Sequence, residues 1–335
     1  MKFSFLLYDS RSGSTLFSAL LNRYRGISVS HETGFIPIVL EYEKDIINQT
    51  QLDELLSLIE NEVQYSELGI DQKQVRETIN REQFPISKNR VIEVILEIYF
   101  KQRDSEATLR VVKSPRLFHH LDTLIKLFPD VSFIHIIRDG RAVFNSKRTM
   151  VSINGIKTQS NLIKAAFEWK RKMRKSKAMG SRVLEVKYET LVESPDQAMK
   201  NVLDYYQLDE QSRELTKEQS VYSSRIGDKQ KHLHENVKNK PEQSRINYWR
   251  DSLSSSDIAL YEIIAGRELQ KRGYELVNPD ISACALFTPN ILLRVLFYMP
   301  HQLVIYARNI WWHTFVDKSI GRKIKSKIYE IKSGW

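Results

Sequence analysis

Polar side chains of the kinds that bind anions or move protons stand at four points of the chain, each after an apolar run. These points are the stretch RSGST at 11–15, the pair His31 and Glu32, then Lys113, and then Arg138. Guanidinium, ammonium, hydroxyl and backbone amide groups bind anions, and a carboxylate or an imidazole can accept a proton. The residue types therefore indicate an anion-binding site with a proton acceptor near it.

The stretch RSGST stands between the apolar run FLLY and a helical pattern that starts near Ser14. The first turn of a helix offers unsatisfied backbone amides and the positive end of the helix dipole. The hydroxyls of Ser14 and Thr15 and the Arg11 guanidinium add donors around Ser12 and Gly13. Loops that bind magnesium triphosphates have a lysine after their last glycine, and none follows here. The alternative interpretation is an ordinary helix start capped by Ser12 or Ser14.

A second candidate anion contact follows the apolar run 131–137. Arg138 comes directly after this run, and Ser146 lies eight residues further on, within a helical pattern. A guanidinium and a hydroxyl at that separation can close on one phosphate group. The alternative is a surface arginine near an ordinary serine.

Five apolar runs alternate with helical patterns and predict strands at 2–8, 27–30, 109–112, 131–137 and 183–186. Because these runs are apolar throughout, we expect an α/β fold, with a central parallel sheet flanked by helices on both faces. Ligands of such sheets bind beyond the carboxyl ends of the strands. The polar residues described above stand at these ends, so the sheet would bring them together.

Two of these stretches carry a family resemblance. RSGST after the first strand and RDGRAVFNS after a central strand resemble the two cofactor motifs of sulfotransferases that use 3′-phosphoadenosine 5′-phosphosulfate (PAPS). EVKYETLVESP, which contains Tyr188, is similar to the family's segment whose tyrosine lies against the adenine. RINYWRDSL and KRGYEL resemble the closing part of bacterial members. The resemblance covers about residues 1–275.

The resemblance implies a P-loop-like sheet, with PAPS as co-substrate and no metal. The loop 11–15 would hold the 5′-phosphosulfate, Arg138 with Ser146 the 3′-phosphate, and Tyr188 the adenine. Many cytosolic members have a lysine in place of Arg11 and a tryptophan soon after it. With arginine there and Leu16 following, the chain is more similar to the branches that modify carbohydrates and tyrosine.

Sulfuryl transfer requires a base for the acceptor hydroxyl and a positive group at the departing phosphate oxygen. Glu32 is the predicted base, and the tyrosine-modifying branch has a glutamate in a similar place; His31 is the alternative base. A helix-capping or ion-pairing role is the structural alternative for Glu32. Lys113 leaves a buried strand and is predicted to act at the departing oxygen together with Arg11, whereas a surface lysine is the alternative.

The polar segment 220–245 lacks periodicity and predicts a long loop over the site. Lys240 and Arg225 within it would then reach the phosphosulfate. Histidines occur at 119–120 and in the sequence HLH at 232–234, but no cysteine or carboxylate spacing accompanies them. We therefore expect no metal site.

The composition fits a globular protein: the chain has 335 residues, of which 41% are hydrophobic and 27% charged. A single cysteine, Cys284, excludes an internal disulfide. The first predicted strand starts at residue 2, so we expect no signal peptide. We expect a cytoplasmic protein with one sulfotransferase domain at 1–279, in which the mostly helical insert 36–105 shapes the acceptor pocket. Residues 280–335 are expected to form a helical appendage.

Much of the net charge of +10 lies at one end, because residues 281–335 contain eight Lys or Arg and two acidic residues. The segment is apolar but interrupted by prolines and arginines, so we do not expect it to span a membrane. Trp311 and Trp312, followed by KSIGRKIKSKIYEIK, predict a peripheral helix on an anionic membrane. Packing on the core, or against a second subunit in a homodimer, is an equal alternative.

These patterns predict an enzyme that moves a sulfuryl group from PAPS to the hydroxyl of a sugar, lipid or tyrosine. Its products would be a sulfate ester and 3′,5′-adenosine bisphosphate. One alternative is a P-loop-like kinase, which would require magnesium. Another is a non-catalytic protein that binds anions or a membrane surface. No nucleic-acid partner is expected.

A chain that ends at Pro279 is expected to stay folded and to bind nucleotide, but to lose affinity for anionic vesicles. Each basic residue near such a surface contributes about 1 kcal/mol, and salt screens this attraction. Vesicle co-sedimentation of the full chain at rising ionic strength measures the effect, with the shortened chain as the control. An insoluble shortened chain would contradict the prediction, as would a full chain that ignores anionic vesicles at low salt.

Overall fold

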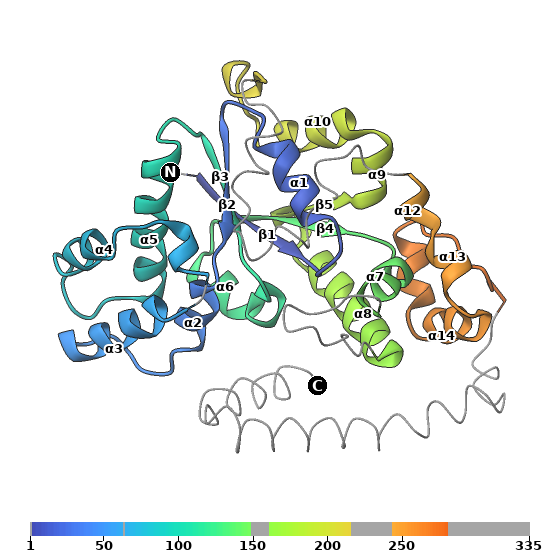
Figure 1. Cartoon of the computed structure of the whole chain (residues 1–335), viewed down its shortest axis with the longest axis horizontal. Helices are drawn as coiled ribbons and strands as arrows, with labels where there is room; N and C mark the ends of the chain where they lie inside the picture. The colour runs from blue at the N-terminus through green and yellow to red at the C-terminus, as the bar shows by residue number, and fades with distance from the viewer. Residues whose placement is uncertain (1, 63, 149–160, 216–242, 281–335) are drawn as a thin grey trace. The chain divides into compact units, whose positions relative to one another are not determined.

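The structure, a computed structural model, describes residues 2–62, 64–148, 161–215 and 243–280 (Figure 1). The predictions for Lys240, Arg225, the histidines at 232–234 and the segment 281–335 lie outside these residues. The chain divides into two compact units. The first comprises Met1–Arg138 and Ser176–Ile246, and the described residues of the second are 139–148, 161–175 and 247–280.

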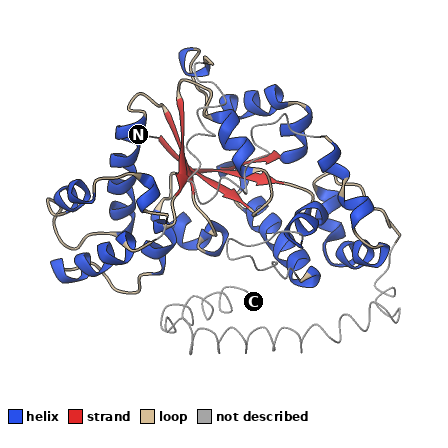
Figure 2. Cartoon of the chain, viewed as in Figure 1, coloured by secondary structure: helices blue, strands red, loops and turns tan. Residues whose placement is uncertain are grey.

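A five-stranded parallel sheet forms the centre of the first unit, in the order β2-β3-β1-β4-β5. Its strands are drawn in red in Figure 2. The strands are β1 (Lys2–Tyr8), β2 (Ile27–Glu32), β3 (Leu109–Lys113), β4 (Ser132–Ile137) and β5 (Val183–Lys187). The strand that precedes the RSGST loop, β1, is therefore central, between β3 and β4. Each predicted strand is present, within two residues of its expected end.

Side chains of β1 enter the cores on both faces of the sheet, because successive residues of a strand point to opposite faces. Phe5 and Leu7 pack among α2 to α6, whereas Leu6 packs among α1, α9 and α10. The first set is α2 (Phe35–Glu41), α3 (Gln49–Glu60), α4 (Gln72–Ile79), α5 (Lys88–Arg103) and α6 (Leu121–Leu127); the second is α1 (Ser14–Leu21), α9 (Tyr188–Glu193) and α10 (Pro195–Tyr205). The expected α/β fold, with helices on both faces of a parallel sheet, is confirmed.

The helices of the stretch 36–105 begin where the sequence supplies caps. The Asn48 side chain accepts a hydrogen bond from the Gln51 amide at the start of α3, and Asp71 does the same for the Lys73 amide at α4. The helix expected at 117–128 is instead a 3₁₀ turn, Leu117–His119, followed by α6, because His120 between them leaves the helical conformation. Among the described helices, none is both long and apolar enough to cross a membrane.

The second unit contains α7 (Gly140–Arg148), most of α8 (Leu162–Ala178), α13 (Trp249–Ser252) and α14 (Ser255–Lys271). Its first helix starts at a glycine for a steric reason. A Cβ on Gly140 would lie 2.2 Å from the Tyr261 hydroxyl and 2.8 Å from the Trp169 ring. The helix start is thus pressed against two large buried side chains.

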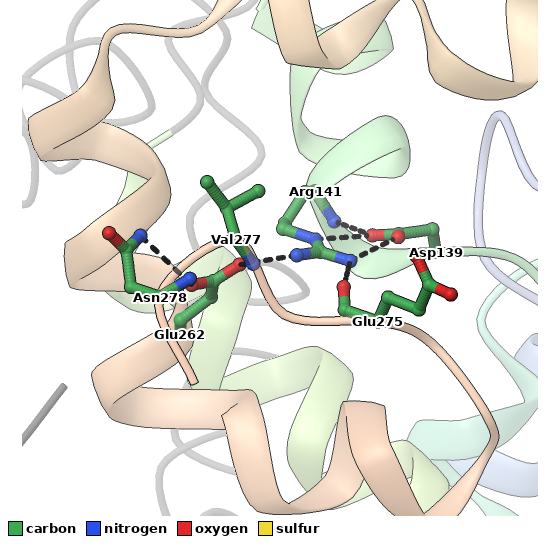
Figure 3. A network of polar contacts seen from close by, with 6 residues as sticks. All are labelled: Asp139, Arg141, Glu262, Glu275, Val277 and Asn278. Atoms are coloured by element: carbon green, nitrogen blue, oxygen red, sulfur yellow. Dashed lines mark hydrogen bonds and ion pairs between the residues drawn. The ribbon is translucent and has the colours of Figure 1, made fainter. Parts of the chain in front are cut away.

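A buried arginine holds the start of α7 in place (Figure 3). Arg141 is 1% exposed and donates to both oxygens of Asp139, with Nε–Oδ1 at 3.0 Å and Nη2–Oδ2 at 2.7 Å. It also pairs with Glu262 of α14 and donates to the Glu275 carbonyl at 2.8 Å. The Trp249 ring covers the guanidinium, with its centroid 4.0 Å away.

Glu262, the other carboxylate that pairs with Arg141, is also held by several contacts. Its oxygens accept hydrogen bonds from the backbone amides of Val277 and Asn278, both at 2.9 Å. One carboxylate therefore joins α7, α14 and the chain that follows α14 (Figure 3). A buried charge that loses such a partner is left without compensation.

Replacing Glu262 with alanine is expected to lower the free energy of unfolding by about 3–5 kcal/mol, because Arg141 would remain buried with an incomplete set of partners. Urea denaturation measures this change. Glu77→Ala is the matched control, since Glu77 pairs with Lys73 on the exposed surface of α4 and its loss should be undetectable. Equal stabilities of the two variants would show that the buried network does not stabilise the unit.

Candidate active site

The loop after β1 is closed by its own backbone and begins α1 without a capping side chain. The Asp9 carbonyl accepts from the Ser12 amide at 3.1 Å and from the Ser12 hydroxyl at 2.6 Å. Gly13 is the N-cap of α1, with φ +92°, and it has no side chain to cover the first turn. The alternative that Ser12 or Ser14 caps this helix is therefore wrong. The amides at the start of α1 are the groups that an anion would contact.

The Tyr188 ring packs against this loop and against Arg138, the residue that follows β4. A Cβ on Gly13 would lie 2.3 Å from Cδ2 of Tyr188, so glycine is required there for space as well as for its positive φ. The Arg138 guanidinium carbon lies 4.1 Å from the centroid of the same ring, a cation–π distance. Arg138 also donates to the Arg11 carbonyl at 3.0 Å. The predicted phosphate-binding residues Arg11, Gly13 and Arg138 thus meet around Tyr188.

Three arginines gather at this point of the first unit. Arg138 donates to the carbonyl of Arg245, at 2.9 Å, and Arg245 belongs to α12 (Ser244–Asn247). Burial lowers the pKa of Arg11, and the positive charges of Arg138 and Arg245 lower it further. Like charges held together in a partly buried place create a positive potential that favours an anion. Arg245 was not predicted, although RINYWRDSL, which contains it, carried part of the family resemblance.

Glu32 and Lys113, the predicted base and its cationic partner, form an ion pair at the ends of neighbouring strands. They are paired in the register of β2 and β3, and Lys113 Nζ lies 3.4 Å from Glu32 Oε1. The register shifts just before Glu32, where the Ser30 hydroxyl accepts from the Lys113 amide at 2.9 Å. Such irregularities re-aim side chains. Lys113 Nζ also lies 3.4 Å from Thr15 Oγ1, which connects the pair to the loop.

Two further donors hold the Glu32 carboxylate. The Tyr8 hydroxyl donates to Oε1 at 3.2 Å and the Gln64 amide to Oε2 at 3.1 Å. Burial alone would raise the pKa of Glu32, but the charge of Lys113 and the hydrogen bonds from Tyr8, Gln64 and Lys113 together lower it below its ordinary value. Glu32 is therefore a carboxylate at neutral pH. The alternative base, His31, packs its ring against Tyr99 of α5, with the centroids 6.4 Å apart.

The predicted site residues are thus brought together in two groups that share the loop. Arg11, Gly13, Arg138 and Tyr188 form one group, and Glu32, Lys113 and Thr15 form the other. Ser146 lies on α7, in the second unit, so its pairing with Arg138 stays a prediction.

Tyr8 and Gln64 were missed in the sequence for different reasons. Tyr8 ends an apolar run and looks like part of the core, whereas Gln64 lies in a helical stretch far from the other site residues. Within the described part of the chain, no three His, Cys, Asp or Glu side chains are grouped closely enough to hold a metal ion.

Gly13→Ala is expected to destabilise the protein more than Gly180→Ala. Both glycines have positive φ, so each substitution forces a left-handed alanine, at a cost of about 1–2 kcal/mol. Gly180 has open space around the added methyl group, whereas at Gly13 the Tyr188 ring must also move. Urea denaturation of both variants measures the difference. Equal losses would mean that the contact between Gly13 and Tyr188 is not a constraint.

Comparison with known proteins agrees with this geometry. Residues 9–212, more than half of the chain, match the sequence profile described as "Sulfotransferase family". A Caenorhabditis briggsae protein named "Putative protein-tyrosine sulfotransferase" is 23% identical over 285 residues, which cover 82% of this chain and 90% of that protein. The solved structure "Sulfotransferase Domain from the Curacin Biosynthetic Pathway" is similar with a TM-score of 0.50 and 16% identity, covering 82% of this chain and 98% of that one.

The similarity to that solved domain concerns the fold, and it confirms the P-loop-like arrangement expected for the sheet. The family match extends from the residue after β1 to beyond α10, so it includes both groups of site residues but neither Tyr8 nor Arg245. The resemblance seen in the two short motifs is confirmed over a much longer stretch. This chain belongs to the Sulfotransferase family.

Proposed function

We propose that the protein transfers a sulfuryl group from PAPS to the hydroxyl of an acceptor, and releases a sulfate ester and 3′,5′-adenosine bisphosphate. One observation carries this proposal: the Lys113 ammonium lies 3.4 Å from both the Glu32 carboxylate and the Thr15 hydroxyl of the loop. A proton acceptor, a cation and an anion-binding loop therefore converge. Sulfuryl transfer needs these three groups at one place.

The residues around the loop fit a donor with several negative charges. The positive charges of Arg138 and Arg245 both act against that of Arg11, and the uncapped start of α1 adds oriented amides. We infer that 11–15 holds the phosphosulfate and that Arg138, with Ser146, holds the 3′-phosphate. Tyr188 and Lys240 are proposed as further contacts. When bound, PAPS supplies an activated sulfuryl group and a phosphate leaving group.

Glu32 is proposed as the base and Lys113 as the group that stabilises negative charge on the departing phosphate oxygen. Glu32 is ionised and lies against Lys113, whereas the ring of the alternative base His31 lies against Tyr99. Lys113 is 3% exposed, and a charge shielded from water acts more strongly on its neighbours. Arg11 is proposed to act beside it at the phosphosulfate.

The acceptor is proposed to be a hydroxyl-bearing sugar, lipid or tyrosine. The name of the Caenorhabditis briggsae relative makes a tyrosine peptide a reasonable first acceptor to assay. The proposals of a cytoplasmic location, a homodimer and peripheral membrane contact through 281–335 rest on the sequence alone.

The protein is expected to bind 3′,5′-adenosine bisphosphate more tightly than 5′-AMP, and Arg138→Ala should remove most of this preference. A charge-assisted hydrogen bond contributes about 1.5–3 kcal/mol, or roughly 10- to 100-fold in affinity. Thermal-shift titration measures both affinities, since a ligand stabilises the state that it binds. Arg25→Ala is the matched control, because Arg25 pairs with Glu214 on the exposed surface.

Binding of the bisphosphate should persist in excess EDTA. If the two nucleotides bound equally, the assignment of Arg138 to the 3′-phosphate would be wrong. Stabilisation by magnesium ATP but not by the bisphosphate would instead support the kinase alternative.

A further inference from the structure

Tyr8, the last residue of β1, contacts both members of the ion pair. Its hydroxyl donates to Glu32 Oε1 at 3.2 Å, and the centroid of its ring lies 5.6 Å from Lys113 Nζ. The backbone explains this position, because β1 is paired with β3, which ends at Lys113. Tyr8 therefore contacts both the base and the cation, and the loop 11–15 follows it in the chain.

Two of the partners of Lys113 lie at the same distance from it. Its Nζ lies 3.4 Å from Glu32 Oε1 on one side and 3.4 Å from Thr15 Oγ1 on the other. Under the proposed function, on which this inference rests, a phosphate group sits at the loop beside Thr15. Opposite charges attract strongly in a buried place, so the ammonium would be drawn toward the loop. Glu32 Oε1 would then lose part of its contact with the cation.

The remaining donors on Glu32 act on different oxygens. Gln64 donates to Oε2 at 3.1 Å, whereas Tyr8 donates to Oε1, the oxygen that Lys113 shares. Gln64 follows α3, Tyr8 ends β1 and Lys113 ends β3, so the three groups come from three different parts of the chain. Of these, Tyr8 alone can keep Oε1 in place when Lys113 moves toward the loop.

We propose that Tyr8 is a positioning residue for the base: its hydroxyl holds Glu32 Oε1 while Lys113 contacts the phosphate group at the loop. Glu32 then keeps the same orientation whether Lys113 is paired with it or is drawn to the phosphate group, and it can accept the proton of the acceptor hydroxyl. Tyr8 keeps its own proton throughout.

The geometry also fixes the sign of a measurable effect. Burial pushes the pKa of Glu32 upward, while the charge of Lys113 and the hydrogen bonds from Tyr8, Gln64 and Lys113 outweigh it. Drawing Lys113 away should raise the pKa of Glu32 and make the carboxylate a stronger base when the donor is present. Removing the Tyr8 hydroxyl should raise it as well, and more so when Lys113 is engaged at the loop, because the two act on the same oxygen.

Carbon-13 NMR of the glutamate carboxyl carbons measures the midpoint of Glu32 directly, with its signal identified by its loss in Glu32→Gln. The full-length protein and Tyr8→Phe are titrated with and without 3′,5′-adenosine bisphosphate. Phenylalanine keeps the ring that packs near Lys113 and removes only the hydroxyl. We expect a higher midpoint in Tyr8→Phe in both states, with the larger difference in the nucleotide-bound state.

Two variants separate this effect from a general loss of structure. Tyr42→Phe removes another tyrosine–glutamate hydrogen bond, from Tyr42 to Glu54 Oε2 at 3.3 Å, and should leave the Glu32 midpoint unchanged. Gln64→Ala acts on the other oxygen and should raise the midpoint equally with and without nucleotide. If Tyr8→Phe does not fold, Gln64→Ala still shows whether a hydrogen bond to the carboxylate, here at Oε2, lowers the Glu32 midpoint.

Unchanged Glu32 midpoints in Tyr8→Phe, in both states, would overturn the proposal, as would a Tyr8→Phe effect that is no larger with nucleotide than without. If the bisphosphate does not bind the wild-type protein, the proposed function fails. The nucleotide-free titration then still decides whether the Tyr8 hydroxyl holds the Glu32 carboxylate.

Discussion

An ammonium group that is removed from water is stable only where the protein supplies compensating partners, and the site depends on one such group. Lys113 is 3% exposed, and desolvation of a buried ion costs several kcal/mol even after relaxation. Glu32 and Thr15 compensate it, and they come from an edge strand and from the first turn of a helix. The positions of β2, β3 and α1 must therefore agree closely, since displacing any of them would separate the buried charge from a partner.

The arginine cluster works in the opposite sense, because it brings like charges together. Uncharged groups are among those that hold Arg138. The carbonyls of Arg11 and Arg245 accept hydrogen bonds from Arg138, and the ring of Tyr188 lies under its guanidinium. These contacts position the guanidinium without neutralising its charge. An anion that entered would meet donors already in place, which is how preorganised sites bind without a large entropic cost.

The parts of the site that could be predicted were those governed by rules local to the chain. An apolar run followed by Arg11, Lys113 or Arg138 marks the carboxyl end of a strand, and the rule for parallel sheets gathers such ends. The contact between Glu32 and Lys113 could not be predicted in this way, because it depends on the strand order. The sheet places β2 beside β3, with β1 on the other side of β3.

The missed residues depend on contacts that no local pattern encodes. Arg245 is 107 residues from Arg138 in the sequence, although the two form a hydrogen bond. Gln64 is separated from Glu32 by α2 and α3. Ser12 shows the converse, because a residue type that favours helix caps was used to close a turn. Packing decided these cases, and packing is a property of the whole first unit.

The central place of β1 has a consequence for how the first unit assembles. Lys2 pairs with Leu109, and Ser4 with Ser132, so the strand has no neighbour until two much later segments are available. Closing such long loops costs entropy before any contact rewards it, and folds with many distant pairings form slowly. During that interval the apolar part of β1, residues 5–8, is exposed on both faces and along both edges, and such exposure allows chains to associate wrongly. The strand that precedes the loop 11–15 is synthesised early and paired late, so it needs protection while the protein folds.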